Sequence, residues 1–257
     1  MKAMILAAGL GTRLLPLTSN RPKALVEVAG QTMLEITLSR LRFFGVNEVI
    51  VNAHHFAPMI VEYLKAKENF GMRIEVSHEE QLLDTGGGLK KAAHFFLDSN
   101  GGSQEPFILH NVDVISSIDL KRMVQVHIEN AALATLAVQD RESSRYLLFD
   151  EQNQLCGRQT ALAEKAEGAQ IEWVGAIRQA QALAFSGIHV VSSQIFAKLH
   201  DDGVFSIIPT YLNLVAEREK IIAFRADESY WRDLGRPENV LEAARDLAGG
   251  KYSPMAC

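Results

Sequence analysis

The sequence predicts an α/β fold in which a mostly parallel sheet is covered by helices on both faces. Over the first 140 residues, short apolar runs alternate with amphipathic stretches, the pattern of strands joined by crossover helices. The apolar runs are those of strands buried on both faces. Of 257 residues, 47% are hydrophobic and 22% are charged, which is average for globular proteins, so we expect one large domain.

The elements of the first half follow from these two patterns. Buried strands are expected at Ala3–Ala8, Glu48–Asn52, Arg73–Ser77, Phe107–His110 and Leu133–Val138. Between them, apolar residues recur every three or four positions, which indicates helices. These helices are expected at Thr32–Phe44, Ala57–Ala66, Leu89–Leu97 and Leu120–Glu129.

After Asp140 the parallel pattern is interrupted. Short strands are predicted at Arg145–Asp150 and Leu155–Gln159, and residues 160–172 form a polar stretch that we interpret as a linker-like insertion. The pattern then resumes with a strand, two helical segments, a strand and a last helix opening at Pro237, since proline favours a first helical turn. The first four of these are expected at Leu183–Val191, Ser193–His200, Ile207–Glu217 and Lys220–Arg225.

Composition excludes several functional classes. The formal charge is −5, from 26 Lys and Arg against 31 Asp and Glu, and an acidic chain of this kind does not favour nucleic acid as a partner. No apolar run reaches the roughly 18–20 residues of a membrane helix, and no cleavage site follows the N-terminus. The two cysteines, Cys156 and Cys257, form no disulfide framework. We therefore expect a soluble cytoplasmic protein without a membrane partner.

One segment departs from the overall acidity. Residues 1–26 contain Lys2, Arg13, Arg21 and Lys23 and no acidic residue, which makes this segment a candidate anion site. Its strand leads directly into Gly9-Leu10-Gly11, a loop that lets backbone N–H groups approach phosphates closely. Solvated charges on an ordinary surface loop are the alternative interpretation.

Two common phosphate motifs do not match this loop. A dinucleotide fingerprint needs a third glycine where Leu14 stands, and Pro16 prevents a helix from starting there. A phosphate-binding loop of the GxxxxGK type followed by Ser or Thr is absent from the sequence. A nicotinamide oxidoreductase is therefore a weak hypothesis, and a longer basic loop that suits a triphosphate remains.

The loop closely resembles the signature of the sugar-1-phosphate nucleotidyltransferases. The matching residues are Leu6 to Leu14, then Pro16-Leu17-Thr18, then Arg21 to Val28. Within that family, the uridylyltransferases of N-acetylmuramic acid 1-phosphate and the guanylyltransferases of mannose and heptose 1-phosphate look most similar. The resemblance implies a Rossmann-like, mixed and mostly parallel sheet with a small β-rich sugar-binding subregion.

The resemblance also implies a division of the single domain, residues 1–248. Residues 1–140 would be the nucleotide-binding half, 141–235 the sugar-binding half with the second metal ligand, and 236–248 a C-terminal helix, followed by a frayed tail of residues 249–257. It implies that Arg13 holds the departing pyrophosphate and that Lys23 contacts the reacting phosphates. The base and ribose would be held by Leu6, Ala7, Ala8, Gly9, Gly11 and Thr12, with Glu79 near the base.

Two aspartates follow apolar strands. Asp113 stands after Phe107–His110, at a strand end of the kind where open α/β sheets bind ligands, and Asp233 lies in Tyr230-Trp231-Arg232-Asp233-Leu234-Gly235. An aspartate at a strand end is more commonly a turn or cap residue. By resemblance, however, Asp113 and Asp233 are expected to bind Mg²⁺, which takes one or two carboxylates together with phosphate oxygens and water.

The remaining candidate residues concern the sugar. Three consecutive glycines at a helix start allow a ligand to approach the backbone, although a flexible capped turn is also plausible. By resemblance, Gly86 is assigned to the nucleotide, and the sugar is assigned Asp84, Thr85, Gly87, Asn111 and Gly187. Many family members clamp the sugar phosphate with Glu-Lys-Pro, but here Glu164-Lys165 is followed by Ala166, so Arg145 and Arg158 are candidate substitutes.

These observations favour an enzyme that joins a nucleoside triphosphate, UTP or GTP, to a sugar 1-phosphate with Mg²⁺ as cofactor. The products would be a nucleoside diphosphate sugar and pyrophosphate. A non-catalytic nucleotide-sugar sensor on the same fold is the alternative. Such a sensor could lose Lys23, Asp113 or Asp233 without penalty, and all three are present.

Overall fold

The computed structural model describes residues 1–97, 105–161, 169–175 and 179–252. Its strands are β1 (Lys2–Leu6), β2 (Glu27–Val28), β3 (Gln31–Thr32), β4 (Glu48–Ala53), β5 (Arg73–His78), β6 (Phe107–Asn111), β7 (Val114–Ser116), β8 (Ala134–Gln139), β9 (Arg145–Phe149), β10 (Leu155–Ala161), β11 (Ala169–Trp173), β12 (Gln181–Val191), β13 (Ile221–Arg225) and β14 (Trp231–Asp233).

The α-helices are α1 (Met33–Phe43), α2 (Ala57–Ala66), α3 (Asp84–Lys91), α4 (Ala93–Phe96), α5 (Leu120–Glu129), α6 (Ile207–Ala216) and α7 (Pro237–Ala248). Four 3₁₀ turns complete the secondary structure of the described residues: η1 (Thr12–Leu14), η2 (Lys23–Leu25), η3 (Glu68–Gly71) and η4 (Ser193–Lys198). None of the helices in this part of the chain has the length and apolar character needed to cross a membrane.

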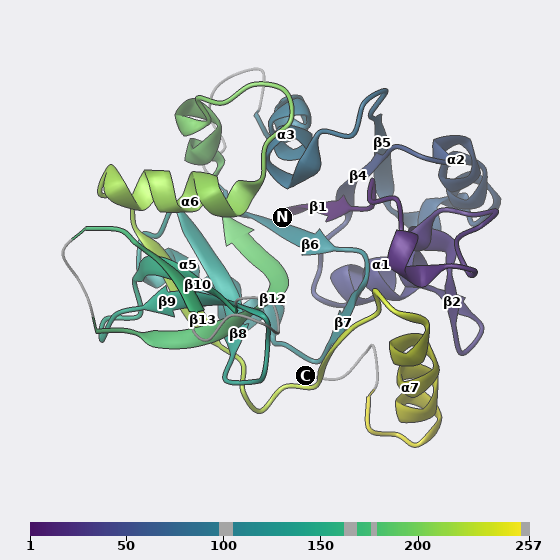
Figure 1. Cartoon of the computed structure of the whole chain (residues 1–257). Coiled ribbons are helices and arrows are strands. Elements are labelled where there is room, and N and C mark those ends of the chain that lie inside the picture. Colours follow the sequence, from purple (N-terminus) through teal and green to yellow (C-terminus); the bar gives the residue numbers. More distant parts are fainter. Residues whose placement is uncertain (98–104, 162–168, 176–178, 253–257) are drawn as a thin grey trace.

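The centre of the molecule is a ten-stranded sheet in the order β11-β10-β9-β12-β6-β1-β4-β5, with β8 and β13 joined to it through β12 (Figure 1). Strands β6, β1, β4 and β5 are parallel throughout. Strand β12 runs antiparallel to β6, β8 and β9, and β9, β10 and β11 continue the antiparallel arrangement. The expected mixed α/β sheet with a β-rich subregion is confirmed.

Both faces of the sheet are buried. Along β1, Ala3 and Ile5 belong to one hydrophobic core, and Met4 and Leu6 belong to the other, because alternate residues of a strand point to opposite faces. Helices α1, α2, α5 and α7 contribute to the first core, and α3, α4 and α6 contribute to the second. This two-sided burial explains why the strands are continuous apolar runs.

Several sequence-based boundaries were wrong. The helix expected at Leu89–Leu97 begins earlier, at Asp84, and breaks into α3 and α4 at Ala92. The segment expected to be helical after Ser193 is the 3₁₀ turn η4, and β1 ends at Leu6, two residues early. Part of the expected linker is strand β11, which pairs with β10, whereas residues 162–168 lie outside the described residues.

Three buried histidines predict a loss of stability in acid. Burial lowers the pKa of His110 and of His127 to about 4 and that of His189 to about 3. Since unfolded histidine titrates near pH 6.5, the unfolded chain binds more protons than the folded chain between about pH 6.5 and these lowered values. We expect the free energy of unfolding to decrease below pH 6.5 by about 1.4 kcal/mol per pH unit for each histidine.

Urea unfolding between pH 8 and pH 5 measures this dependence. His127→Gln should reduce the slope of the unfolding free energy against pH by the contribution of one histidine. His55→Gln, at an exposed position, should leave this slope unchanged. An identical slope in the wild type and in His127→Gln would contradict the assignment.

Candidate active site

The carboxyl ends of three neighbouring parallel strands form the base of a cavity of about 490 Å³. In the register of the sheet, Leu6 of β1 pairs with Asn52 of β4 on one side and with Asn111 of β6 on the other, and all three residues line the cavity. Open α/β sheets bind ligands at this edge. The other lining residues are Ala8, Gly9, Arg13, Lys23, Leu82, Asp84, Thr85, Asp113, Val204 and Asp233.

The loop after β1 is folded by Gly11. Its φ of +67° favours glycine, and its carbonyl oxygen accepts hydrogen bonds from the Thr18 hydroxyl at 2.8 Å and from Leu14 N at 2.9 Å. A Cβ at this position would lie 2.9 Å from Thr18 Cγ2. Gly11 and Thr12 do not line the cavity themselves. The turn that they begin carries Arg13, which does line it.

The two distant aspartates lie on neighbouring segments. Strand β14 pairs antiparallel with β7, with Asp233 opposite Val114, and Leu234 N donates to the Asp113 carbonyl at 2.7 Å. Both carboxylates therefore line the same cavity.

Two basic residues face these carboxylates. Lys23 Nζ lies 2.8 Å from Asp113 Oδ2, and the two side chains are only 15% and 10% exposed. The Arg13 guanidinium lies against Gly235, because a Cβ there would be 2.9 Å from Arg13 Nη2. Gly235 N donates to Asp233 Oδ1 at 2.5 Å. The cavity wall thus carries the two basic residues beside Asp113 and Asp233, and Asp84 is a third acidic residue that lines it.

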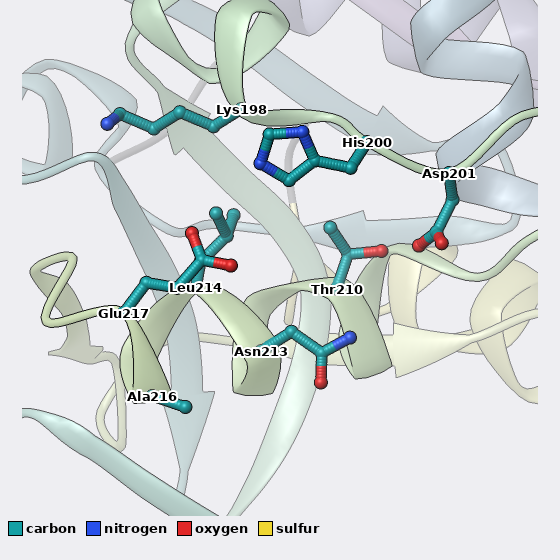
Figure 2. Close-up of a pocket in the computed structure, with 8 residues that line it drawn as sticks. All are labelled: Lys198, His200, Asp201, Thr210, Asn213, Leu214, Ala216 and Glu217. Atoms are coloured by element: carbon teal, nitrogen blue, oxygen red, sulfur yellow. The ribbon is translucent and has the colours of Figure 1, made fainter.

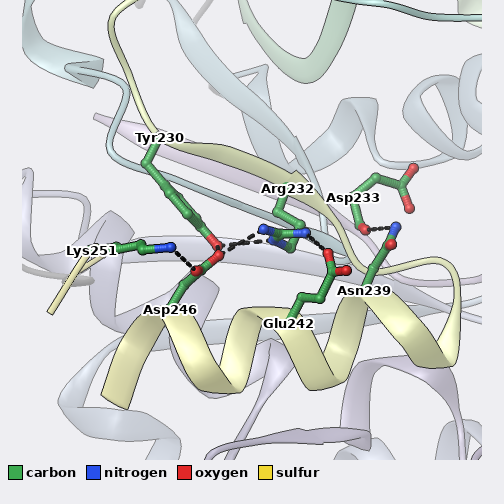
Figure 3. A network of polar contacts seen from close by, with 7 residues as sticks. All are labelled: Tyr230, Arg232, Asp233, Asn239, Glu242, Asp246 and Lys251. Carbon is green, nitrogen blue, oxygen red and sulfur yellow. Dashed lines mark hydrogen bonds and ion pairs between the residues drawn. The ribbon is translucent and has the colours of Figure 1, made fainter. Parts of the chain in front are cut away.

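Helix α7 holds the strand that carries Asp233, as Figure 3 shows. Asn239 Nδ2 donates to the Asp233 carbonyl at 2.7 Å, and Arg232 donates to Asp246 Oδ2 at 2.7 Å and to Glu242. Tyr230 O–H donates to the same Asp246 oxygen at 2.9 Å. This network fixes the backbone on both sides of Asp233.

The three glycines of α3 pack against other parts of the chain. Gly86 N and Gly87 N both donate to the Phe205 carbonyl, at 2.9 and 3.2 Å, and a Cβ at Gly87 would lie 2.1 Å from Gly203 O. A Cβ at Gly88 would lie 2.8 Å from the Asn52 amide nitrogen. The close approach expected of a ligand is therefore made by the chain itself. Of this segment, Asp84 and Thr85 line the cavity.

Glu79 is buried behind the cavity wall. Its carboxylate accepts hydrogen bonds from Asn52 Nδ2 at 2.7 Å and from Leu83 N at 3.0 Å, and it is only 1% exposed. The Asn52 side-chain oxygen in turn accepts from Ala7 N at 2.7 Å. Glu79 and Ala7 do not line the cavity themselves. They orient Asn52, which does line it.

Gly187 packs closely against a residue that lines the cavity. Its φ is +75°, and a Cβ there would lie 2.9 Å from Asn111 Nδ2 and from Val114 Cγ2. Glycine at this position therefore allows β12 to pack against Asn111, which lines the cavity.

A second cavity of about 590 Å³ shares Asp84 with the first. Arg145, Tyr146 and Phe185 line it, together with Arg158, whose Nε donates to Glu172 at 2.6 Å. Within the described residues, Arg145 makes no ion pair. Glu164, Lys165 and Ala166, where the sequence departs from a Glu-Lys-Pro motif, lie outside the described residues.

Two residues of this region, Asn52 and Arg141, were not predicted from the sequence. Asn52 is the last residue of a predicted strand, and Asn111 directly follows another. A polar residue at the carboxyl end of a strand could therefore have indicated Asn52. Arg141 gave no signal, because only the fold places its guanidinium 3.6 Å from the centre of the Trp231 ring. Burial lowers the pKa of Arg141, and the nearby Asp233 and Tyr146 oppose that shift.

A third cavity, of about 440 Å³, lies between η4 and α6 (Figure 2). It is lined by Lys198, His200, Asp201, Thr210, Asn213, Leu214, Ala216 and Glu217. Lys198 is paired with Glu219 at 2.7 Å, and none of the residues predicted from the sequence to bind substrate lines this cavity.

Comparisons with known proteins show the family to which the chain belongs. Residues 2–249 match the family model described as nucleotidyl transferase. The chain is 33% identical over 254 residues to N-acetylmuramate alpha-1-phosphate uridylyltransferase of Caulobacter vibrioides, covering 96% of each chain. It is 28% identical to mannose-1-phosphate guanylyltransferase of Mycobacterium tuberculosis, covering 96% of this chain and 65% of that protein.

Solved structures show the same fold. HddC from Yersinia pseudotuberculosis, complexed with GMP-PN, superposes with a TM-score of 0.72 at 22% identity, covering 96% of this chain and 99% of that chain. A putative glucose-1-phosphate thymidylyltransferase from Bacillus anthracis, in complex with a sucrose, gives a TM-score of 0.75 at 18% identity, covering 95% and 94%.

Proposed function

The chain belongs to the nucleotidyl transferase family, whose members include enzymes that join nucleotides to sugar 1-phosphates, and from this premise we propose that it transfers a uridylyl or guanylyl group to a sugar 1-phosphate. The observation that carries the proposal is the presence of Arg13, Lys23, Asp113 and Asp233 around one cavity at the carboxyl ends of the strands. We propose UTP and N-acetylmuramic acid 1-phosphate as the first pair to test, because the match to the uridylyltransferase relative covers 96% of that protein.

In the proposed reaction, a phosphate oxygen of the sugar 1-phosphate attacks the α-phosphorus of the triphosphate. The bond between that phosphorus and the oxygen bridging to the β-phosphate breaks, and pyrophosphate leaves. The attacking oxygen is already an anion at neutral pH, so a general base is unnecessary. The residues must align the two substrates in line and balance their negative charge.

Each charged side chain has a role in this proposal. Arg13, which lies beside Asp233, binds the leaving pyrophosphate through its planar guanidinium. Lys23 exchanges its contact with Asp113 for the transferred phosphate, where negative charge increases in the transition state. The backbone of Leu6, Ala8 and Gly9 holds the nucleotide, and the second cavity holds the sugar.

The two aspartates fit a magnesium ion. The described residues contain no group of three or more His, Cys, Asp and Glu side chains arranged to hold a metal, so a site formed by protein ligands alone is not indicated there. Two carboxylates that share a cavity with phosphate oxygens and water suit Mg²⁺. We propose that Asp113 and Asp233 hold the ion. When bound, Mg²⁺ would neutralise phosphate charge and hold the two substrates' phosphates together.

Pyrophosphate release tests the proposal directly. With Mg²⁺, the protein is assayed over UTP, GTP, dTTP, CTP and ATP against the 1-phosphates of N-acetylmuramic acid, N-acetylglucosamine, glucose, mannose and heptose. We expect release from a pairing with UTP or GTP that EDTA abolishes. Binding of nucleotide or nucleotide sugar without release from any pairing would instead favour the sensor.

Lys23→Met is expected to lower kcat by about 10²-fold to 10³-fold, because the positive charge at the transferred phosphate is lost. The measurement is kcat and KM for both substrates with the best pairing. Lys121→Met is the control, since Lys121 is exposed on α5 away from the cavity. Unchanged kcat in Lys23→Met would exclude the proposed role of the lysine.

A further inference from the structure

Arg141 is a half-buried guanidinium without an ionic partner among the described residues. Its Nη2 donates to the Phe185 carbonyl at 2.8 Å, and its Nε is buried and makes no hydrogen bond there. A charged group removed from water is usually paired with an opposite charge or fully hydrogen-bonded. Arg141 makes no ion pair among the described residues: its other hydrogen bond goes to the Glu142 carbonyl at 3.5 Å, and Asp233 acts on it only as a nearby charge.

The side chain is also held in a defined orientation. The guanidinium lies 3.6 Å from the centre of the Trp231 ring, and the indole N–H of Trp231 donates to the Ser186 carbonyl at 2.8 Å. Stacking on an aromatic face fixes the plane of a guanidinium and leaves its edge free to donate hydrogen bonds. Arg141 is thus preorganised, unlike Arg145, whose exposed side chain has no such support.

Two contacts of Arg141 place it beside the junction of the two cavities, although Arg141 itself is not among the lining residues of either. Phe185, to which it is bonded, lines the second cavity. Trp231, on which it stacks, is two residues from Asp233, and positions i and i+2 of a strand share a face. Asp233 lines the first cavity. In the proposed reaction, the phosphate of the sugar 1-phosphate must occupy this junction, because it links the sugar to the α-phosphorus.

We propose that Arg141, stacked on Trp231, binds the phosphate group of the sugar 1-phosphate. This inference rests on the proposed function, and it supplies the clamp for which the sequence shows no Glu-Lys-Pro motif. Of the two substitutes suggested by the sequence, Arg158 is bonded to Glu172, and Arg145 lines the second cavity with an exposed side chain. Neither contacts the strand that carries Asp233 in any described hydrogen bond or ion pair.

Steady-state kinetics separate a phosphate clamp from a structural role. Arg141→Gln should raise KM for the sugar 1-phosphate about 10-fold to 100-fold, as expected for losing charge-assisted hydrogen bonds, with KM for the triphosphate within about twofold. Arg141→Lys keeps the charge but loses the planar donor edge, so its KM for the sugar 1-phosphate should lie between those of the wild type and Arg141→Gln. Arg73→Gln is the matched control. Arg73, on the edge strand β5, also has its guanidinium over an aromatic ring, that of Phe95.

Tryptophan fluorescence gives a readout that does not depend on turnover. The chain has two tryptophans, so Trp173→Phe leaves Trp231 as the only one. In this background we expect inorganic phosphate and the sugar 1-phosphate to change the emission of Trp231, and the unphosphorylated sugar to have no effect. Adding Arg141→Gln should abolish the change.

The outcomes distinguish this inference from the proposed function. If no substrate pairing gives turnover, a phosphate-dependent Trp231 signal that requires Arg141 would support an anion site in a protein with another activity. Equal increases of both KM values in Arg141→Gln, or a phosphate signal unaffected by that substitution, would overturn the inference. So would a selective increase in KM for the sugar 1-phosphate in Arg145→Gln or Arg158→Gln but not in Arg141→Gln.

Discussion

Asp113→Asn is expected to abolish nucleotidyl transfer, with a decrease in kcat/KM of about 10³-fold or more, while the protein remains folded. The substitution keeps the shape of the side chain but removes a charge that is 2.8 Å from Lys23 and faces the proposed metal position. A neutral amide binds Mg²⁺ weakly, because this ion prefers carboxylate and phosphate oxygens. Pyrophosphate release measured over a range of Mg²⁺ concentrations tests the expectation.

The control for this variant is Asp202→Asn, which removes an aspartate that is 88% exposed and paired with Lys90 on the surface. It should retain wild-type kinetics. Circular dichroism must show that Asp113→Asn keeps its secondary structure, so that lost activity reports the site. Wild-type activity in a folded Asp113→Asn protein would refute the proposed metal site.

Gly87→Ala is expected to destabilise the protein by about 3 kcal/mol or more. The added Cβ would lie 2.1 Å from the Gly203 carbonyl oxygen, which belongs to the backbone and cannot rotate away. Relief would require α3 to separate from residues 203–205, which breaks the hydrogen bonds from Gly86 N and Gly87 N to Phe205 O. Urea unfolding at neutral pH measures the loss.

Gly30→Ala provides the comparison. Gly30 has a φ of +83°, but a Cβ there would meet no atom within 4 Å. Alanine should therefore cost only about 1 kcal/mol, from the left-handed backbone conformation. If the two variants were equally stable, the contact between α3 and Gly203 would not hold the helix in place.

The central sheet could be predicted from the sequence because its strands are buried on both faces. A short, continuous apolar run such as Phe107–Leu109 is typical of a strand that helices cover on each side. The short strands β7 and β14 could not be predicted, because each has three residues and gains its hydrogen bonds only from the other. The break at Ala92 likewise depends on packing that local patterns do not encode.

The charged residues of the candidate site were easier to predict than their supports. Arg13, Lys23 and Asp113 stand in a specific motif or at a strand end, where their chemistry is visible in the sequence. Gly86 and Gly187 were expected to face a ligand, but the structure packs them against Phe205 and Asn111. A glycine in a sequence indicates that another group packs closely against the backbone, but it does not show whether that group is a ligand or another part of the chain. Arg141 depends on Trp231, a residue far along the chain, so no local pattern could reveal it.

Strand β12 joins two parts of the central sheet. Its first three residues, Gln181 to Leu183, are the only ones in the described ladder that pair with β9, whereas Ile188 to Val191 pair with β6 beside the buried centre. In the strand order of the sheet, β9, β10 and β11 therefore reach the strands that bear Leu6 and Asn111 through β12. The second cavity is lined mainly by these outer strands, and the first lies at the carboxyl ends of the central ones, so β12 separates the two cavities in the order of the sheet.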